Sequence, residues 1–106
     1  MSKSQRRKGA DYELEIANAL HDYLGIVVRR NIGQSRDGGD DITLPPYRLE
    51  LKRRAKISTY EFMEQCERAC RTGDVPVVMM RADGEETLVV MRLNDWIKIA
   101  REEILK

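Results

Sequence analysis

Two acidic residues lie in segments that have the pattern of neighbouring β-strands. Asp41 opens one alternating segment (41–44), and Glu50 lies in the next one (47–53). Only Pro45-Pro46 separates the segments, and a two-residue connection there would place Asp41 opposite Glu50. Carboxylates directly opposite each other repel, so we expect either a proton on one of them or a cation between them.

The chemistry that suits such a pair is binding of a divalent metal ion. Carboxylate oxygens favour Mg²⁺ or Mn²⁺, which also bind phosphate. Lys52 lies two residues beyond Glu50, on the same strand face, where its ammonium group can hold a phosphate oxygen or orient a water molecule. The alternative is structural: an acidic pair neutralised by Lys52 or Arg48 at an exposed sheet edge.

A third acidic residue, Glu13, lies on the apolar stripe of a predicted helix. It precedes Ala17, Leu20 and Leu24 at helical spacing. A carboxylate on an inward-facing stripe is costly, so we expect a charged or polar group to meet Glu13. The alternative is an acid near the helix N-terminus that complements the helix dipole.

These residues need a scaffold, and the sequence predicts an α/β fold. Because residues 47–53, 59–72 and 75–82 have the pattern strand, helix, strand, we expect a parallel crossover. The full order α-β-β-β-α-β-β-α predicts a mixed central sheet flanked by helices. The predicted elements are helices at 10–24, 59–72 and from a cap at Asn94 onward, and strands at 26–30, 41–44, 47–53, 75–82 and 87–91.

The charge distribution favours one basic face. The 106 residues carry 19 Lys+Arg and 18 Asp+Glu, but the balance is +4 in residues 1–56 and −3 in residues 57–106. Basic clusters in the first half suit a phosphate backbone. Ordinary solvated surface charge is the alternative explanation of these clusters.

Composition also limits the compartment and the domain organisation. No apolar run approaches the roughly 20 residues of a membrane span, and the first residues lack a signal-peptide core, so we expect a cytoplasmic protein. Cys66 and Cys70 are interpreted as buried small apolar residues, and Trp96 as a core residue. We expect a flexible basic arm at residues 1–8 and a single domain at 9–106.

In order, Gly9-(x3)-Glu13, Asp41-Ile42 and Glu50-Leu51-Lys52 resemble the PD-(D/E)XK nuclease superfamily. Lys8 before Gly9, a loop serine and Gln65 are similar to the Holliday junction resolvase branch, and VRR-NUC-like phage nucleases share this layout. The resemblance implies a restriction-endonuclease-like core, α-β-β-β-α-β, over residues 10–82, plus an extra C-terminal strand and helix. Asp41 is assigned rather than Asp40 because it directly precedes Ile42, although no proline precedes it.

The resemblance also implies roles for individual residues. Asp41, Glu50 and the Leu51 backbone carbonyl would hold Mg²⁺, for which Mn²⁺ can substitute. Glu13 would complete that site directly, through water, or as part of a second one. Lys52 would orient the attacking water. Family members leave a 5′-phosphate and a 3′-hydroxyl. The expected DNA contacts are Arg29, Arg30, Ser35, Arg36, Arg53, Arg54 and Gln65.

The resulting hypothesis is a Mg²⁺-dependent endonuclease that cleaves branched DNA such as a four-way junction. Paired cuts need two sites, so we expect a homodimer. Residues 87–91 and the final helix either form its interface or only cover the sheet. The alternatives are a nickase, a restriction-like nuclease, a DNA-repair or packaging nuclease, and a non-catalytic DNA-binding module.

Overall fold

The computed structural model describes residues 3–30 and 41–106. Its element order is the predicted α-β-β-β-α-β-β-α. The elements are α1 (Lys3–Leu24), β1 (Arg29–Arg30), β2 (Ile42–Leu44), β3 (Tyr47–Arg54), α2 (Thr59–Ala69), β4 (Val75–Ala82), β5 (Leu88–Val90) and α3 (Leu93–Ile104).

The strands form one mixed sheet in the order β1-β2-β3-β4-β5. β3 and β4 are parallel, and the other three neighbouring pairs are antiparallel. The β2–β3 hairpin pairs Leu44 with Tyr47 and Ile42 with Leu49, which is the register predicted from the two-residue connection. The prolines between these strands are joined by a cis peptide bond.

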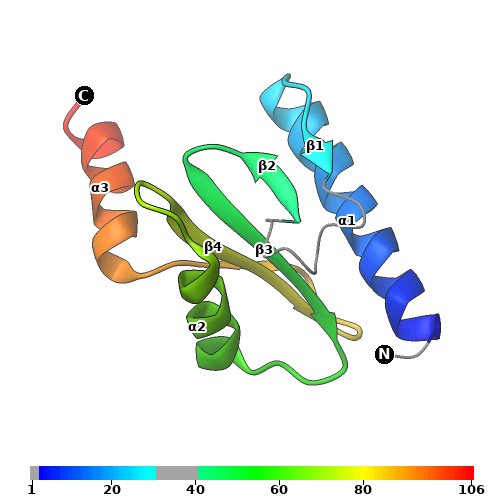
Figure 1. Cartoon of the computed structure of the whole chain (residues 1–106). Helices are drawn as coiled ribbons and strands as arrows, with labels where there is room; N and C mark the ends of the chain where they lie inside the picture. Colours follow the sequence, from blue (N-terminus) through cyan, green and yellow to red (C-terminus); the bar gives the residue numbers. More distant parts are fainter. Residues whose placement is uncertain (1–2, 31–40) are drawn as a thin grey trace.

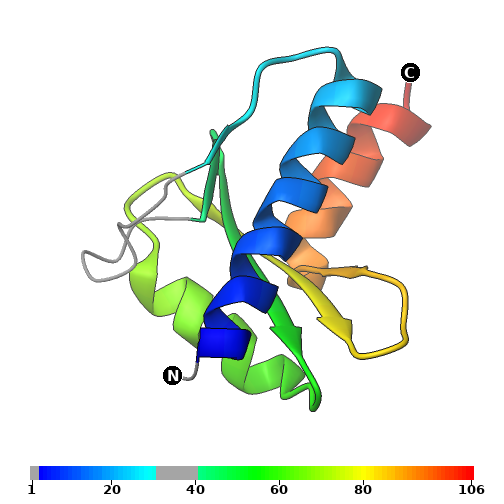
Figure 2. The same cartoon turned by 90° about the vertical axis from the view of Figure 1, so that its right-hand side faces the viewer.

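Helices cover both faces of the sheet. α1 lies on one side, with α2 and α3 on the other (Figure 1). After a 90° turn α1 stands in front and α3 behind it (Figure 2). Because side chains alternate along a strand, Leu49 and Val77 pack with α1, whereas Val78 packs with α2. The sheet is therefore the rigid layer from which the polar residues of β3 project.

Two features of the helices differ from the prediction. Residues 3–8 belong to α1, so the flexible arm predicted at 1–8 is wrong for them. Lys, Ser, Gln and Arg are all compatible with a helix, and Lys8 is anchored by Asp83 at 3.1 Å. α3 begins at Leu93 without a side-chain cap bond, so Asn94 is not its cap.

The interior also differs from the prediction at one aromatic residue. Trp96, predicted to be a core residue, is 52 % exposed, because no residue of α3 is buried. Cys66 is fully buried, as predicted, whereas Cys70 is half-buried; both are free thiols. Within residues 3–30 and 41–106, no helix has the length and apolarity of a membrane span.

Candidate active site

The site forms where β2 stops and β3 continues. β2 pairs with β3 as far as Leu49, whereas β3 runs on to Arg54. Asp41 lies at this step: its N–H donates to the Leu49 carbonyl at 3.2 Å, and its Oδ2 accepts the Leu51 N–H at 2.8 Å. The Asp41 side chain therefore lies against the part of β3 that extends past β2.

Asp41 and Glu50 place two mutually repelling carboxylates close together. Asp41 directly precedes Ile42, which pairs with Leu49, and the charge of Glu50 acts on the Asp41 carboxylate, so the two acids lie close together. Burial and, secondarily, the negative charge of Glu50 raise the pKa of Asp41 from 3.8 to about 7, although the Leu51 N–H opposes the rise. Without a metal ion Asp41 is therefore about half protonated at neutral pH.

Lys52 is held close to this pair. Its Nζ lies 3.4 Å from Glu50 Oε1 and 5.4 Å from the centre of the Phe62 ring, so a carboxylate and an aromatic face both position the ammonium group. Arg48 is buried, and within the described residues its Nε and Nη2 have no hydrogen-bond partner. Lys52, rather than Arg48, is the cation that forms an ion pair with Glu50.

Glu13 reaches the same region from α1. Its carboxylate is half-buried and lies 3.9 Å from the guanidinium of Arg30. Burial raises the pKa of Glu13, the charge of Glu50 adds to the rise, and Arg30 opposes it. Because α1 begins at Lys3, Glu13 lies in mid-helix, so a role as an N-terminal acid complementing the helix dipole is wrong.

The donor chemistry at this step suits a hard divalent cation. Asp41 and Glu50 supply oxygen ligands, and their mutual repulsion would be relieved by a cation. The carbonyl of Leu51 lies on the same edge as Asp41, because a strand residue directs its N–H and C=O to one side. In the described part of the chain, however, no three acidic, histidine or cysteine side chains gather closely enough to form a metal-binding group.

The residues predicted to bind DNA are distributed unevenly. Arg29 is exposed on β1, whereas Arg30 turns inward to Glu13 and to the Ala10 carbonyl at 3.3 Å. Gln65 lies on the exposed side of α2. Ser35 and Arg36 lie outside the described residues.

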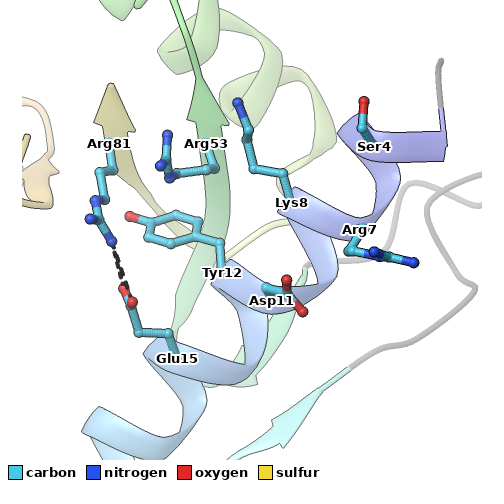
Figure 3. Close-up of a pocket in the computed structure, with 8 residues that line it drawn as sticks. All are labelled: Ser4, Arg7, Lys8, Asp11, Tyr12, Glu15, Arg53 and Arg81. Carbon is cyan, nitrogen blue, oxygen red and sulfur yellow. Dashed lines mark hydrogen bonds and ion pairs between the residues drawn. The ribbon is translucent and has the colours of Figure 1, made fainter. Parts of the chain in front are cut away.

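The two arginines that follow Lys52 lie at the end of β3. Arg53 forms an ion pair with Asp83, and Arg54 donates to the Arg53 carbonyl at 3.3 Å. Arg53 also lines a hollow between α1, β3 and β4, where Arg81 forms an ion pair with Glu15 (Figure 3). Sequence spacing gave no signal for this hollow, because its acidic and basic residues meet only through the tertiary fold.

A comparison with models of protein families identifies the family of the chain. The model of the phage putative PDDEXK endonuclease family matches residues 4–105. The chain belongs to this family. The matched span of this PDDEXK family member contains Glu13, Asp41, Glu50 and Lys52, and membership of an endonuclease family indicates a nuclease that acts on DNA. Neither curated proteins nor solved structures gave a significant match.

Proposed function

We propose that this family member is a Mg²⁺-dependent DNA endonuclease that hydrolyses phosphodiesters to a 5′-phosphate and a 3′-hydroxyl. The observation that carries the proposal is the step beside β3, where Asp41 and Glu50 lie close together and Lys52 forms an ion pair with Glu50. Family membership supports the reaction class. We place its action in the cytoplasm of a bacterial or phage-infected cell.

Each residue then has a defined task. Asp41, Glu50 and the Leu51 carbonyl would hold the divalent ion, with Glu13 completing the set. Such an ion lowers the pKa of bound water and neutralises charge on the phosphate. Asp41 would hold the ion as a carboxylate, since a bound cation would relieve the repulsion with Glu50 that a proton on Asp41 relieves in its absence. Lys52, steered by Glu50 and Phe62, orients the attacking water and stabilises the developing charge.

Cleavage of labelled DNA tests this function. A four-way junction and a linear duplex are each incubated with Mg²⁺, Mn²⁺, Ca²⁺ or EDTA, using the wild-type chain, Glu50→Gln and the matched control Glu64→Gln, which changes an exposed acid on α2. We expect cleavage in Mg²⁺ or Mn²⁺ only, lost in Glu50→Gln and kept in Glu64→Gln. Binding without cleavage by the wild type in every ion would support the DNA-binding module instead.

The substrate we propose is a four-way junction, cut by a homodimer. Each copy has one proposed catalytic site, so symmetric cuts on opposite strands need two copies related by a two-fold axis. Paired symmetric nicks near the crossover would support this substrate. Equal cleavage of junction and plain duplex would contradict it and favour a nickase or a restriction-like or repair nuclease.

The surface for the second copy is formed by α3 and β5. No residue of α3 is buried, and β5 is an edge strand. Eight large apolar side chains here are 42–74 % exposed: Leu88, Val89, Leu93, Trp96, Ile97, Ile99, Ile104 and Leu105. At helical spacing, Leu93, Trp96, Ile97 and Ile104 share one face of α3, and this exposed apolar face is suited to pack against a second copy.

Sedimentation velocity tests the dimer. We expect a dimer for the wild type and a folded monomer for Trp96→Glu, because a buried carboxylate at a two-fold interface is unfavourable. Circular dichroism checks the fold of the variant. A stable wild-type monomer under the conditions of cleavage would contradict the homodimer without affecting the nuclease proposal.

A further inference from the structure

Two hollows meet at the carboxyl end of β3, and neither is lined by the predicted catalytic residues. The larger, about 380 Å³, collects cations from three elements: Arg7 and Lys8 from α1, Arg53 from β3 and Arg81 from β4 (Figure 3). The smaller, about 240 Å³, is also lined by Lys8 and Arg53, together with Arg54. Lys8 and Arg53 therefore stand at the junction of both hollows.

One carboxylate occupies this junction. Asp83, in the turn between β4 and β5, accepts from Lys8 Nζ at 3.1 and 3.3 Å through its two oxygens. Arg53 Nη1 donates to the same carboxylate. The Asp83 side chain is 47 % exposed. A lysine and an arginine from different elements thus converge on a single oxyanion that faces solvent.

This arrangement is a receptor for an oxyanion, because the charge and hydrogen bonds that hold Asp83 are those that hold a phosphate. An exposed ion pair contributes only about 0.2–1 kcal/mol to stability, so displacement of the Asp83 carboxylate by a phosphate costs little free energy. The neighbouring cation Arg81 is already engaged by Glu15 at 3.3 Å. Lys8 and Arg53 are therefore the pair that an incoming phosphate would meet.

The position of the pair relates it to the proposed active site. Arg53 directly follows Lys52, and a strand advances about 3.3 Å per residue. The two side chains point to opposite faces of the sheet, but at the end of β3 the smaller hollow includes Arg54, which shares the face of Lys52. A DNA strand that crosses the end of β3 can thus contact both the Lys8–Arg53 pair and the proposed active site at Lys52.

We propose that Lys8 and Arg53 form a second phosphate site for the DNA strand, and that Asp83 occupies this site in the free protein as a mimic of the phosphate. The proposal rests on the proposed nuclease function. A backbone phosphate of bound DNA displaces the Asp83 carboxylate and takes over both cations. Asp83 thereby weakens DNA binding and favours substrates that place a phosphate at this point.

The test is the affinity of full-length protein for fluorescent DNA duplex and junction, measured by anisotropy in Ca²⁺ over a series of salt concentrations. Asp83→Asn is compared with Glu86→Gln, which makes the same charge change in the same turn. We expect Asp83→Asn to lower Kd about 3- to 5-fold relative to Glu86→Gln. In Arg53→Gln, Kd rises and the slope of log Kd against log salt falls by about 1.

A double variant separates this mechanism from a structural role of Asp83. In Arg53→Gln, the further change Asp83→Asn should tighten DNA binding less than it does in the wild type, because only Lys8 remains to be released. If Asp83→Asn is unfolded, Asp83→Ser gives the same comparison, and Lys8→Gln should raise Kd as Arg53→Gln does. Equal affinity of Asp83→Asn and Glu86→Gln, or weaker binding by folded Asp83→Asn, overturns the proposal.

The two proposals fail separately. If the wild type cleaves DNA in Mg²⁺ but removal of the Asp83 charge does not tighten binding, only the second phosphate site is wrong. If the wild type neither binds nor cleaves DNA, the nuclease function is wrong and the phosphate site falls with it.

Discussion

Replacing Asp41 by asparagine should stabilise the metal-free protein at alkaline pH. Burial and the charge of Glu50 raise the pKa of Asp41 to about 7. The folded protein therefore keeps a proton on Asp41 at pH values where the unfolded chain has already lost it. Native protein binds more protons than unfolded protein in this range, so stability falls as pH rises from about 4 to about 7 and stays lower above it.

The size of the effect follows from the same pKa. A rise from 3.8 to about 7, at about 1.4 kcal/mol per pH unit, corresponds to at most about 4 kcal/mol of lost stability above pH 7. Asparagine has no charge to bury, and its side-chain oxygen can still accept the Leu51 N–H that Asp41 accepts at 2.8 Å. The free energy of unfolding of Asp41→Asn should therefore be nearly independent of this titration.

Urea unfolding in EDTA at pH 5, 6, 7, 8 and 9 measures this difference. We expect the stability of Asp41→Asn relative to the wild type to increase by about 2–3 kcal/mol between pH 5 and pH 8. Asp22→Asn, at an exposed position of α1, is the control and should follow the wild type. Adding Mg²⁺ should recover stability in the wild type but not in Asp41→Asn. If the difference in free energy of unfolding between the wild type and Asp41→Asn is the same at pH 8 as at pH 5, the assignment of a raised pKa to Asp41 is refuted.

Three further substitutions test other parts of the account. Lys52→Met should reduce the single-turnover rate of DNA cleavage at least about 100-fold while DNA affinity in Ca²⁺ stays within a few-fold; unchanged cleavage would remove Lys52 from the site. Glu13→Gln should raise the Mg²⁺ concentration needed for half-maximal cleavage, because a carboxylate near Glu50 is lost; an unchanged requirement would limit Glu13 to its contact with Arg30. Ile42→Ala, in the core and fully buried, should lower the free energy of unfolding by about 2–5 kcal/mol in urea denaturation, and a loss below about 1 kcal/mol would contradict its packing role.

Local patterns were sufficient to predict the β2–β3 hairpin and the meeting of Asp41 with Glu50. Alternation fixes which residues share a face, and the short connection between Leu44 and Tyr47 fixes the register. The alternating pattern also predicted that Lys52 lies beside Glu50. Both results depend only on residues close together in the sequence.

Features that depend on tertiary placement could not be predicted in this way. Lys8 and Asp83 meet although 75 positions separate them in the chain. The apolar stripe of α3 predicted a helix, but periodicity does not show what covers a helix, and Trp96 is exposed rather than buried. The basic stretch before Gly9 lacks apolar residues, yet it continues α1, and Lys8 within it pairs with Asp83 from the other end of the chain.

Calorimetric titration with Mg²⁺ tests most directly whether Asp41 and Glu50 form one metal-binding centre. The heat of binding is measured at pH 7 in buffers of different ionisation enthalpy, so that proton release is measured together with affinity. We predict that the wild type binds Mg²⁺ and releases about half a proton per ion, that Glu64→Gln does the same, and that Asp41→Asn and Glu50→Gln each bind far more weakly. Mg²⁺ binding of equal strength by the wild type, Asp41→Asn and Glu50→Gln would contradict the proposed centre.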